Sequence, residues 1–215
     1  MTQGGGGEKS SFRRWLNATR YAVAAAVTVL IMVVIVNAIK VVLRPDSLQL
    51  SVPGGAISAG RFKPPPEELL AVELNLRAHN PSGRVRMYYL DITAYLFDKS
   101  TPASASRTPD FDSVVYFNPK DIAVLQQETV DSFLALKLKK ASLGPPYFDV
   151  LYNGSRVSDM TLRLDGNLVT EVTSELNKSR QASYYCEQLL VGGNSDDEAI
   201  KYRQNVICKQ GRGLN

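Results

Sequence analysis

The stretch VELNLRAHNPSGRVRMYYLDITAYL, residues 72–96, decides the fold class of this chain. Its first part alternates, with Val72, Leu74 and Leu76 separated by polar residues, which is the pattern of a strand with one buried face. Asn80-Pro81-Ser82-Gly83 then predicts a turn. A second alternating stretch follows, with apolar residues at Leu90, Ile92, Ala94 and Leu96. We therefore expect two strands that can pair as neighbours.

The same period of two recurs on both sides of this stretch. Further strands are predicted at residues 48–52, 114–117, 122–125, 129–139, 160–172, 184–191 and 205–209, with a helical turn at Tyr147 to Tyr152. The last two strands are expected to pair, joined by an acidic loop at residues 192–199. Many short strands separated by Pro or Gly turns predict an all-β fold, an antiparallel immunoglobulin-like or fibronectin III-like β-sandwich of about seven strands. An up-and-down barrel is the alternative.

An apolar run, YAVAAAVTVLIMVVIVNAIKVVL, occupies residues 21–43. The nineteen residues from Tyr21 to Ile39 carry no charge, and as a helix they would reach roughly 29 Å, close to the thickness of the hydrocarbon core of a bilayer. The run therefore predicts an uncleaved signal anchor. A cleaved signal peptide is the main alternative, because a basic leader precedes the run and Val36-Asn37-Ala38 offers small residues for cleavage. A buried core helix would show a polar stripe.

Basic residues are more frequent before the apolar run than directly after it, so the N-terminus is expected to be cytosolic. The predicted organisation is a disordered cytosolic tail (1–20), a transmembrane anchor (21–43) and an extracellular or lumenal domain (44–215). Four basic residues and one acidic residue lie in the tail, so most of the net charge of +4 is there. The domain is then nearly neutral, which argues against a nucleic-acid partner.

Cysteines and glycosylation sequons agree with this topology. The two cysteines, Cys186 and Cys208, are more typical of a disulfide than of a metal site in an exported domain, and two unpaired thiols are the alternative. Glycosylation is predicted at Asn153 and Asn177, each in an Asn-X-Ser triplet. A third sequon, at Asn17, lies on the cytosolic side and should stay unmodified.

No pattern of catalytic, cofactor-binding or metal-binding residues stands out. His79, the only histidine, directly precedes the Asn80-Pro81 turn and is expected to be structural. The acidic residues lack the Asp-Gly-rich spacing of a calcium loop. Bases and aromatics mix at Arg84, Arg86, Tyr88 and Tyr89. Such a mixture could form a ligand face, although it is more often the solvated face of a strand.

The segment Ala78-His79-Asn80-Pro81-Ser82, followed by Tyr88-Tyr89-Leu90-Asp91, resembles the Asn-Pro signature of the second late-embryogenesis-abundant group, the water-stress and hypersensitive-response domain. In that family an alternating strand ends in Asn-Pro and a tyrosine-bearing strand follows. The resemblance covers residues 72–172. With the apolar run, the chain is similar to membrane-bound plant proteins named for harpin-induced and non-race-specific disease-resistance genes. The family signature residues would be Asn80, Pro81, Tyr88 and Tyr89.

The resemblance implies a sandwich placed at the plasma membrane, with roles in defence or abiotic-stress responses and without known catalysis. Together with the topology it predicts a non-enzymatic ectodomain, without cofactor, that binds a partner protein or a cell-wall component, or protects the membrane surface under stress. A homo-oligomer is a further possible form. A carrier for lipid or another small apolar ligand is the alternative, and an apolar pocket above ~300 Å³ would favour it.

Overall fold

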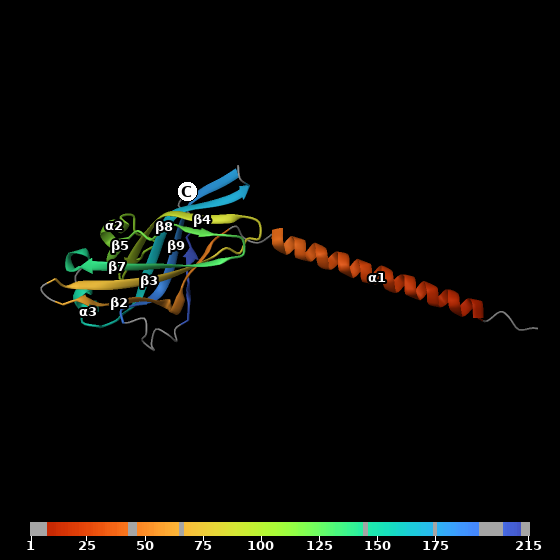
Figure 1. Cartoon of the computed structure of the whole chain (residues 1–215), viewed down its shortest axis with the longest axis horizontal. Coiled ribbons are helices and arrows are strands. Elements are labelled where there is room, and N and C mark those ends of the chain that lie inside the picture. Colours follow the sequence, from red (N-terminus) through yellow and green to blue (C-terminus); the bar gives the residue numbers. More distant parts are fainter. Residues whose placement is uncertain are drawn as a thin grey trace, which may run out of the picture. The chain divides into compact units, whose positions relative to one another are not determined.

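The computed structural model describes residues 8–42, 47–64, 67–143, 146–173, 176–193 and 204–211, and only the backbone of 8–18, 40–42, 172, 173, 176 and 177. The chain divides into two units, Met1–Arg44 and Pro45–Asn215, one residue beyond the predicted boundary. Helix α1 (Glu8–Val42) belongs to the first unit, and the strands belong to the second (Figure 1).

The second unit is mostly β-structure. Its strands are β1 (Gln49–Val52), β2 (Ala56–Lys63), β3 (Leu69–His79), β4 (Arg86–Phe97), β5 (Val115–Phe117), β6 (Ile122–Val124), β7 (Thr129–Lys139), β8 (Val157–Thr173), β9 (Leu176–Val191), β10 (Val206–Ile207) and β11 (Lys209–Gln210). Its short helices are η1 (Pro53–Gly55), α2 (Pro109–Asp112), η2 (Lys140–Ser142) and α3 (Tyr147–Tyr152).

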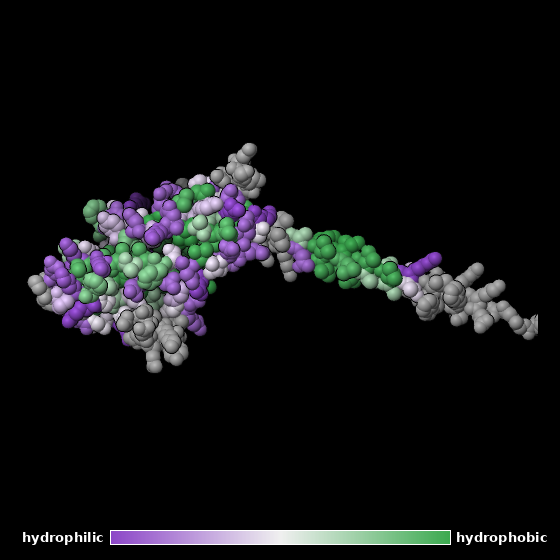
Figure 2. Space-filling model, in the orientation of Figure 1, coloured by the Kyte–Doolittle hydropathy of each residue, from purple (hydrophilic) through white to green (hydrophobic). Residues whose placement is uncertain are grey.

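Helix α1 is long and apolar enough to cross a membrane, as an anchor or as a signal sequence. Its segment Thr19–Ile39 has a mean hydropathy of 2.7, and 0% of its most apolar window is buried within the chain. Figure 2 shows the described side chains of this helix as an almost unbroken hydrophobic surface. The hydroxyl of Thr28 donates a 2.8 Å hydrogen bond to the carbonyl of Ala24, so it needs no partner in lipid. The helix begins at Glu8, so residues 8–20 are helical and not part of a disordered tail.

Two groups of strands make up the sheet. In the first group, β3 pairs with β7 along one edge and with β1 and β2 along the other. In the second group, β8 lies between β4 and β9, and β4 also pairs with β5 and β6. Strand β2 joins the groups, because Ala56 and Ile57 pair in parallel with β9 before the strand continues along β3.

The prediction that residues 72–77 and 90–96 pair as neighbours is wrong. The strands that contain them, β3 and β4, lie in different groups, and the Asn-Pro turn carries the chain from one group to the other. Local alternation defines which face of a strand is buried, but it does not define the strand that pairs with it.

Alternation correctly predicted most of the core. In β3 every second residue from Leu70 to Ala78 is buried. In β4 the buried positions change parity at a bulge, because Asp91 adopts a φ of 52° and the pairing with β8 shifts between Leu90 and Thr93. Leu90, predicted to face the core, is therefore only half-buried. Inward side chains of both groups form one core cluster.

Other predicted elements are confirmed with shifted ends. The predicted strand at 129–139 and the helical turn at Tyr147 to Tyr152 match β7 and α3. Strand β8 is the longest, with 17 residues, as predicted for the segment around Gly166. Strand β9 begins at Leu176, earlier than predicted, because its first half pairs with β8 in a long hairpin.

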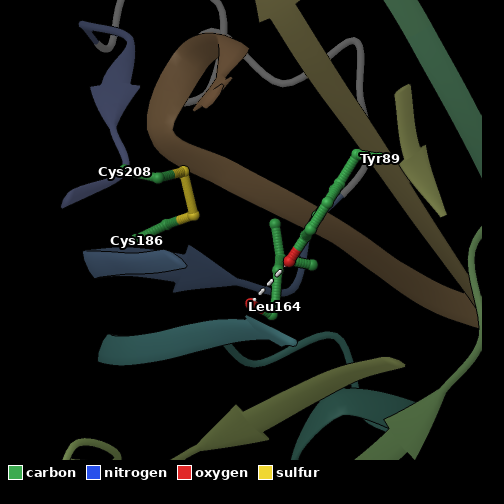
Figure 3. Close-up of a disulfide and its surroundings, with 4 residues drawn as sticks. All are labelled: Tyr89, Leu164, Cys186 and Cys208. Atoms are coloured by element: carbon green, nitrogen blue, oxygen red, sulfur yellow. Dashed lines mark hydrogen bonds between the residues drawn. A yellow bond between two sulfur atoms is a disulfide. The ribbon is translucent and has the colours of Figure 1, made fainter. Parts of the chain in front are cut away.

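The C-terminal segment closes one side of the domain. Strand β10 pairs with β1, the backbone N–H of Cys208 donates to the carbonyl of Leu50 at 2.8 Å, and β11 pairs with β9. The predicted disulfide between Cys186 and Cys208 is confirmed, and Figure 3 shows it tying this segment to β9. The predicted pairing of the last two strands holds for β11 alone, because β10 pairs with the other group. Most of the acidic loop at 192–199 lies outside the described residues.

Candidate functional site

A polar groove of about 1060 Å³ lies on the solvent-facing side of β4, β8 and β9, next to the end of β11. The residues that line it are Asp91, Thr93, Tyr95, Arg163, Asp165, Gly166, Asn167, Arg180, Gln181, Ala182, Ser183, Gln210 and Gly211. Cross-strand pairing explains why they meet. Thr93 lies opposite Asp165, and Asp165 lies opposite Ser183, so three strands contribute one row.

Gly166 and the bulge at Asp91 shape the floor of this groove. A Cβ atom at Gly166 would lie 2.9 Å from the carbonyl oxygen of Leu90 and 2.9 Å from the ring of Tyr89. Only glycine lets β4 and the tyrosine ring approach β8 this closely. A side chain at Gly166 would therefore push β4 and the Tyr89 ring away from β8 and distort the floor of the groove.

Tyr89 supports the floor from inside the core. Its hydroxyl lies 2.9 Å from the carbonyl oxygens of both Leu164 and Ala182, and Figure 3 shows it directed at Leu164. Its ring meets that of Tyr184 edge to face, with the centroids 5.4 Å apart. Burial raises the pKa of Tyr89, and it raises the pKa of Tyr184 to about 12, so both phenols are neutral. The Tyr184 hydroxyl has no hydrogen-bond partner among the described residues.

An internal ion pair borders the groove. The Arg163 Nε lies 2.8 Å from a carboxylate oxygen of Asp165, and both side chains are largely buried, with 14% and 27% exposed. The same guanidinium donates to the carbonyls of Ala103 and Ser106 at 3.1 and 3.0 Å, which ties the loop after β4 to the groove. These contacts occupy Arg163, so it acts as a fixed part of the wall.

The remaining polar groups can contact a ligand. Asn167 donates to Asp91 at 3.3 Å on the exposed surface, and Gln181 lies opposite Asn167 on β9. Burial and a hydrogen bond to Asp110 raise the pKa of Tyr95, so its phenol stays protonated. The groove offers donors and acceptors without a nucleophile activated by a base. Its chemistry suits reversible binding of a polar ligand, and it does not favour the apolar ligand of a lipid carrier.

The predicted Asn-Pro residues lie outside the groove and have a structural role. Asn80 is 0% exposed. Its amide donates to the carbonyls of Val85 and Val124 at 2.8 and 3.3 Å, and its oxygen accepts from the N–H of Ser82 at 3.0 Å. One side chain thus holds the end of β3 against the start of β4 and the end of β6. Pro81 lies in the turn that the Asn80 side chain stabilises.

The predicted tyrosines point to opposite sides of β4. Tyr89 is fully buried, so it belongs neither to the solvated strand face expected at residues 84–89 nor to the alternative, a ligand face. Tyr88 is half-buried and donates to Glu171 at 2.9 Å, and Arg86 lies 4.0 Å from the same carboxylate. Alternation along the strand separates the two rings.

The other predicted residues also lie outside the groove. His79 is half-buried, and its Nδ1 lies 3.0 Å from the Thr129 hydroxyl, consistent with a structural role. Asn153 is exposed at the end of α3. Asn177 lies in β9, and its side chain is outside the described residues. No group of three or more potential metal ligands occurs among the residues that the structure describes.

The sequence did not reveal the groove, because its members are spread from Asp91 to Gly211 and occur at the outward positions of separate strands. The only sequence signal was the run of polar residues at alternate positions, Arg163, Asp165 and Asn167, which is equally typical of any solvated strand face.

Comparisons with known proteins assign no family to this chain. No protein-family model and no curated protein matches the chain. One similar solved structure, a crystal structure of a protein from Archaeoglobus fulgidus, aligns with 62% of this chain and 94% of its own at 11% identity and a TM-score of 0.31. A similarity this low supports no conclusion about fold or function.

Proposed function

We propose that this chain is a non-enzymatic, single-pass membrane protein that displays its β-domain outside the cytosol and binds a partner protein or a cell-wall component there. The N-terminus would be cytosolic, and the membrane would be the plasma membrane. The resemblance to the late-embryogenesis-abundant group gives the expected setting, plant defence or abiotic stress. The observation that carries the proposal is the combination, in one chain, of an uncovered apolar helix and a domain closed by a buried disulfide.

The helix supports membrane attachment. Within the chain, 0% of its most apolar window is buried, whereas the core helix of a soluble protein would be covered. Leaving this many Val, Leu and Ile side chains in water is costly, and a bilayer removes that cost. A cleaved signal peptide remains the competing explanation, and it would leave a secreted form of the same domain.

The disulfide supports the side of the membrane. Cys186 is 0% exposed and Cys208 is 6% exposed, so the bond lies inside the packed domain. Disulfides persist in the secretory route and outside the cell, and the cytosol reduces them. A structural disulfide is therefore compatible with a lumenal or extracellular domain.

We also propose that the domain is a sandwich of the immunoglobulin or fibronectin III type. The two strand groups contribute inward side chains to one core cluster, which is the expected arrangement of facing sheets. Because β2 pairs with β9 and with β3, the two groups are joined along one side, as they would be in a barrel.

The groove is the place where we expect the partner to bind. A photoreactive group at the exposed Gln181 of the full-length protein, expressed in intact plant cells, should give an adduct under light. Mass spectrometry of the labelled peptide that contains residue 181 would distinguish the two partners, because it identifies the attached group as sugar or as peptide. The control carries the group at Ala123, an exposed residue of β6 outside the groove. Equal labelling from both positions would refute binding at the groove.

A further inference from the structure

Strand β7 presents a long free edge. All eleven of its residues pair with β3, from Thr129↔His79 to Lys139↔Leu69, and no other described strand pairs with it. The backbone N–H and C=O groups on its second edge are therefore available to another strand. Natural edge strands are usually short, covered or interrupted by Pro or a bulge. Strand β7 has eleven residues, no Pro and an unbroken register, and no strand of the described part of the chain pairs along this edge.

We propose that β7 pairs antiparallel with β7 of a second copy of this chain, in the register centred on Leu134. In that register each residue lies opposite the one at the same distance on the other side of Leu134. Only registers that match odd with odd positions keep the core face of one copy beside the core face of the other. Among these, the register centred on Leu134 is the one that pairs all eleven residues.

The charges of β7 are complementary in this register. Asp131 lies opposite Lys137 of the second copy, and by symmetry Lys137 lies opposite Asp131, so the interface gains two pairs of opposite charge. Both side chains are solvent-exposed, and in the single chain they contact residues of β3 and β2. Asp131 accepts hydrogen bonds from Arg77 at 2.7 and 3.0 Å, and the Lys137 ammonium lies 4.0 Å from the centre of the Phe62 ring. No two like charges face each other along the pair.

Side-chain sizes are complementary as well. Phe133, which is 63% exposed, lies opposite Ala135 of the second copy, so a large ring meets a small side chain. On the other face, Leu134, Leu136 and Leu138 are only partly buried at the edge of the core, and a second strand would cover them. Unlike the polar groove, this edge has an apolar centre with charges on both sides.

The arrangement has two-fold symmetry, as most homodimers do. The pairing uses backbone and side chains of β7 only, so it does not depend on a ligand in the groove or on the proposed function. Attachment of both copies to one membrane would favour it, because confinement raises their effective concentration.

Cysteine cross-linking tests the register. Two differently tagged full-length chains, one with Phe133→Cys and the other with Ala135→Cys, are co-expressed and membranes are isolated under oxidising conditions. Directly opposite positions in an antiparallel pair are close enough for a disulfide, whereas diagonal positions are mostly too far apart. We expect a mixed covalent dimer at several times the yield given by Phe133→Cys alone. A Tyr116→Cys chain, exposed on β5, measures random collisions. Yields equal to that control would overturn the proposal.

Charge exchange provides the second test. In co-precipitation of two tagged full-length chains, Asp131→Lys and Lys137→Asp should each reduce recovery of the partner several-fold, because each places like charges opposite one another. The double variant restores opposite charges and should restore recovery. The single variant Asp131→Lys and the double variant both lose the contact with Arg77. Loss of that contact therefore cannot explain why the double variant recovers more partner than the single variant. If the double variant recovers no more partner than the single variant with the lower recovery, this register is ruled out.

Discussion

The side chain of Asn80 provides the sharpest test of the structure, because one buried amide joins three segments. Replacement by Ala removes the two hydrogen bonds donated to Val85 and Val124 and the one accepted from Ser82. The side chain is 0% exposed, so water cannot easily reach the groups that lose their partner.

The magnitude follows from these contacts. Each hydrogen bond contributes a net ~1 kcal/mol, and a buried group left without a partner costs 1–3 kcal/mol, so we expect Asn80→Ala to lower the free energy of unfolding by about 3 kcal/mol. With a urea dependence of about 2 kcal/mol/M, the unfolding midpoint should fall by ~1.5 M.

Pulse proteolysis of the full-length protein in nanodiscs, across a urea series, measures this midpoint. The matched control is Asn75→Ala, the same change at an exposed position of β3, the strand that precedes Asn80, which should cost less than about 0.5 kcal/mol. If the two variants unfold at the same urea concentration, the role assigned to Asn80 is wrong.

Three further changes follow from the same structure. Gly166→Val should lower stability by about 1–3 kcal/mol in the same assay, because its Cβ would press on the backbone and ring beside it, whereas a Cβ at Gly60 would have nothing within 4 Å, so Gly60→Val should be nearly neutral. Replacing both Cys186 and Cys208 with Ala should cost about 3 kcal/mol, since the bond closes a loop with a sequence separation of 22, and an unchanged midpoint would contradict this. A hydrogen bond from Arg77 lowers the pKa of Asp131 in the folded chain. The ionised Asp131 therefore stabilises the fold fully at pH values above the pKa that Asp131 has in the unfolded chain. This stabilisation is lost as the pH falls through the lower pKa that Asp131 has in the folded chain. Asp131→Asn should therefore lose less stability than the native chain between neutral and acid pH, and parallel pH profiles would refute the assignment.

Elements defined by local physics could be predicted from the sequence. The alternation around Leu74 predicted a half-buried strand because burial selects apolar side chains at every second position, and the apolar run before Lys40 predicted a helix able to cross a membrane. The presence of two cysteines in the sequence predicted a disulfide between them, since two cysteines allow only one pairing.

Features that depend on distant partners could not be predicted. The pairing of β3 with β7 joins residues far apart in the chain, and nothing near Leu74 specifies Leu134 as its opposite residue. The bulge at Asp91 was missed because the apolar spacing around it looked continuous. The groove has no local signature either, because a polar residue that lines it looks the same in sequence as one that faces open water.

Protease protection in sealed microsomes tests most directly whether helix α1 holds the β-domain on the non-cytosolic side. A full-length chain with different tags at its two ends should lose the N-terminal tag to external protease and keep the C-terminal tag until detergent is added. It should also remain in the membrane pellet after carbonate extraction, with both tags on one polypeptide. Digestion of the C-terminal tag in intact vesicles, or recovery of a shortened chain in the soluble fraction, would contradict the account.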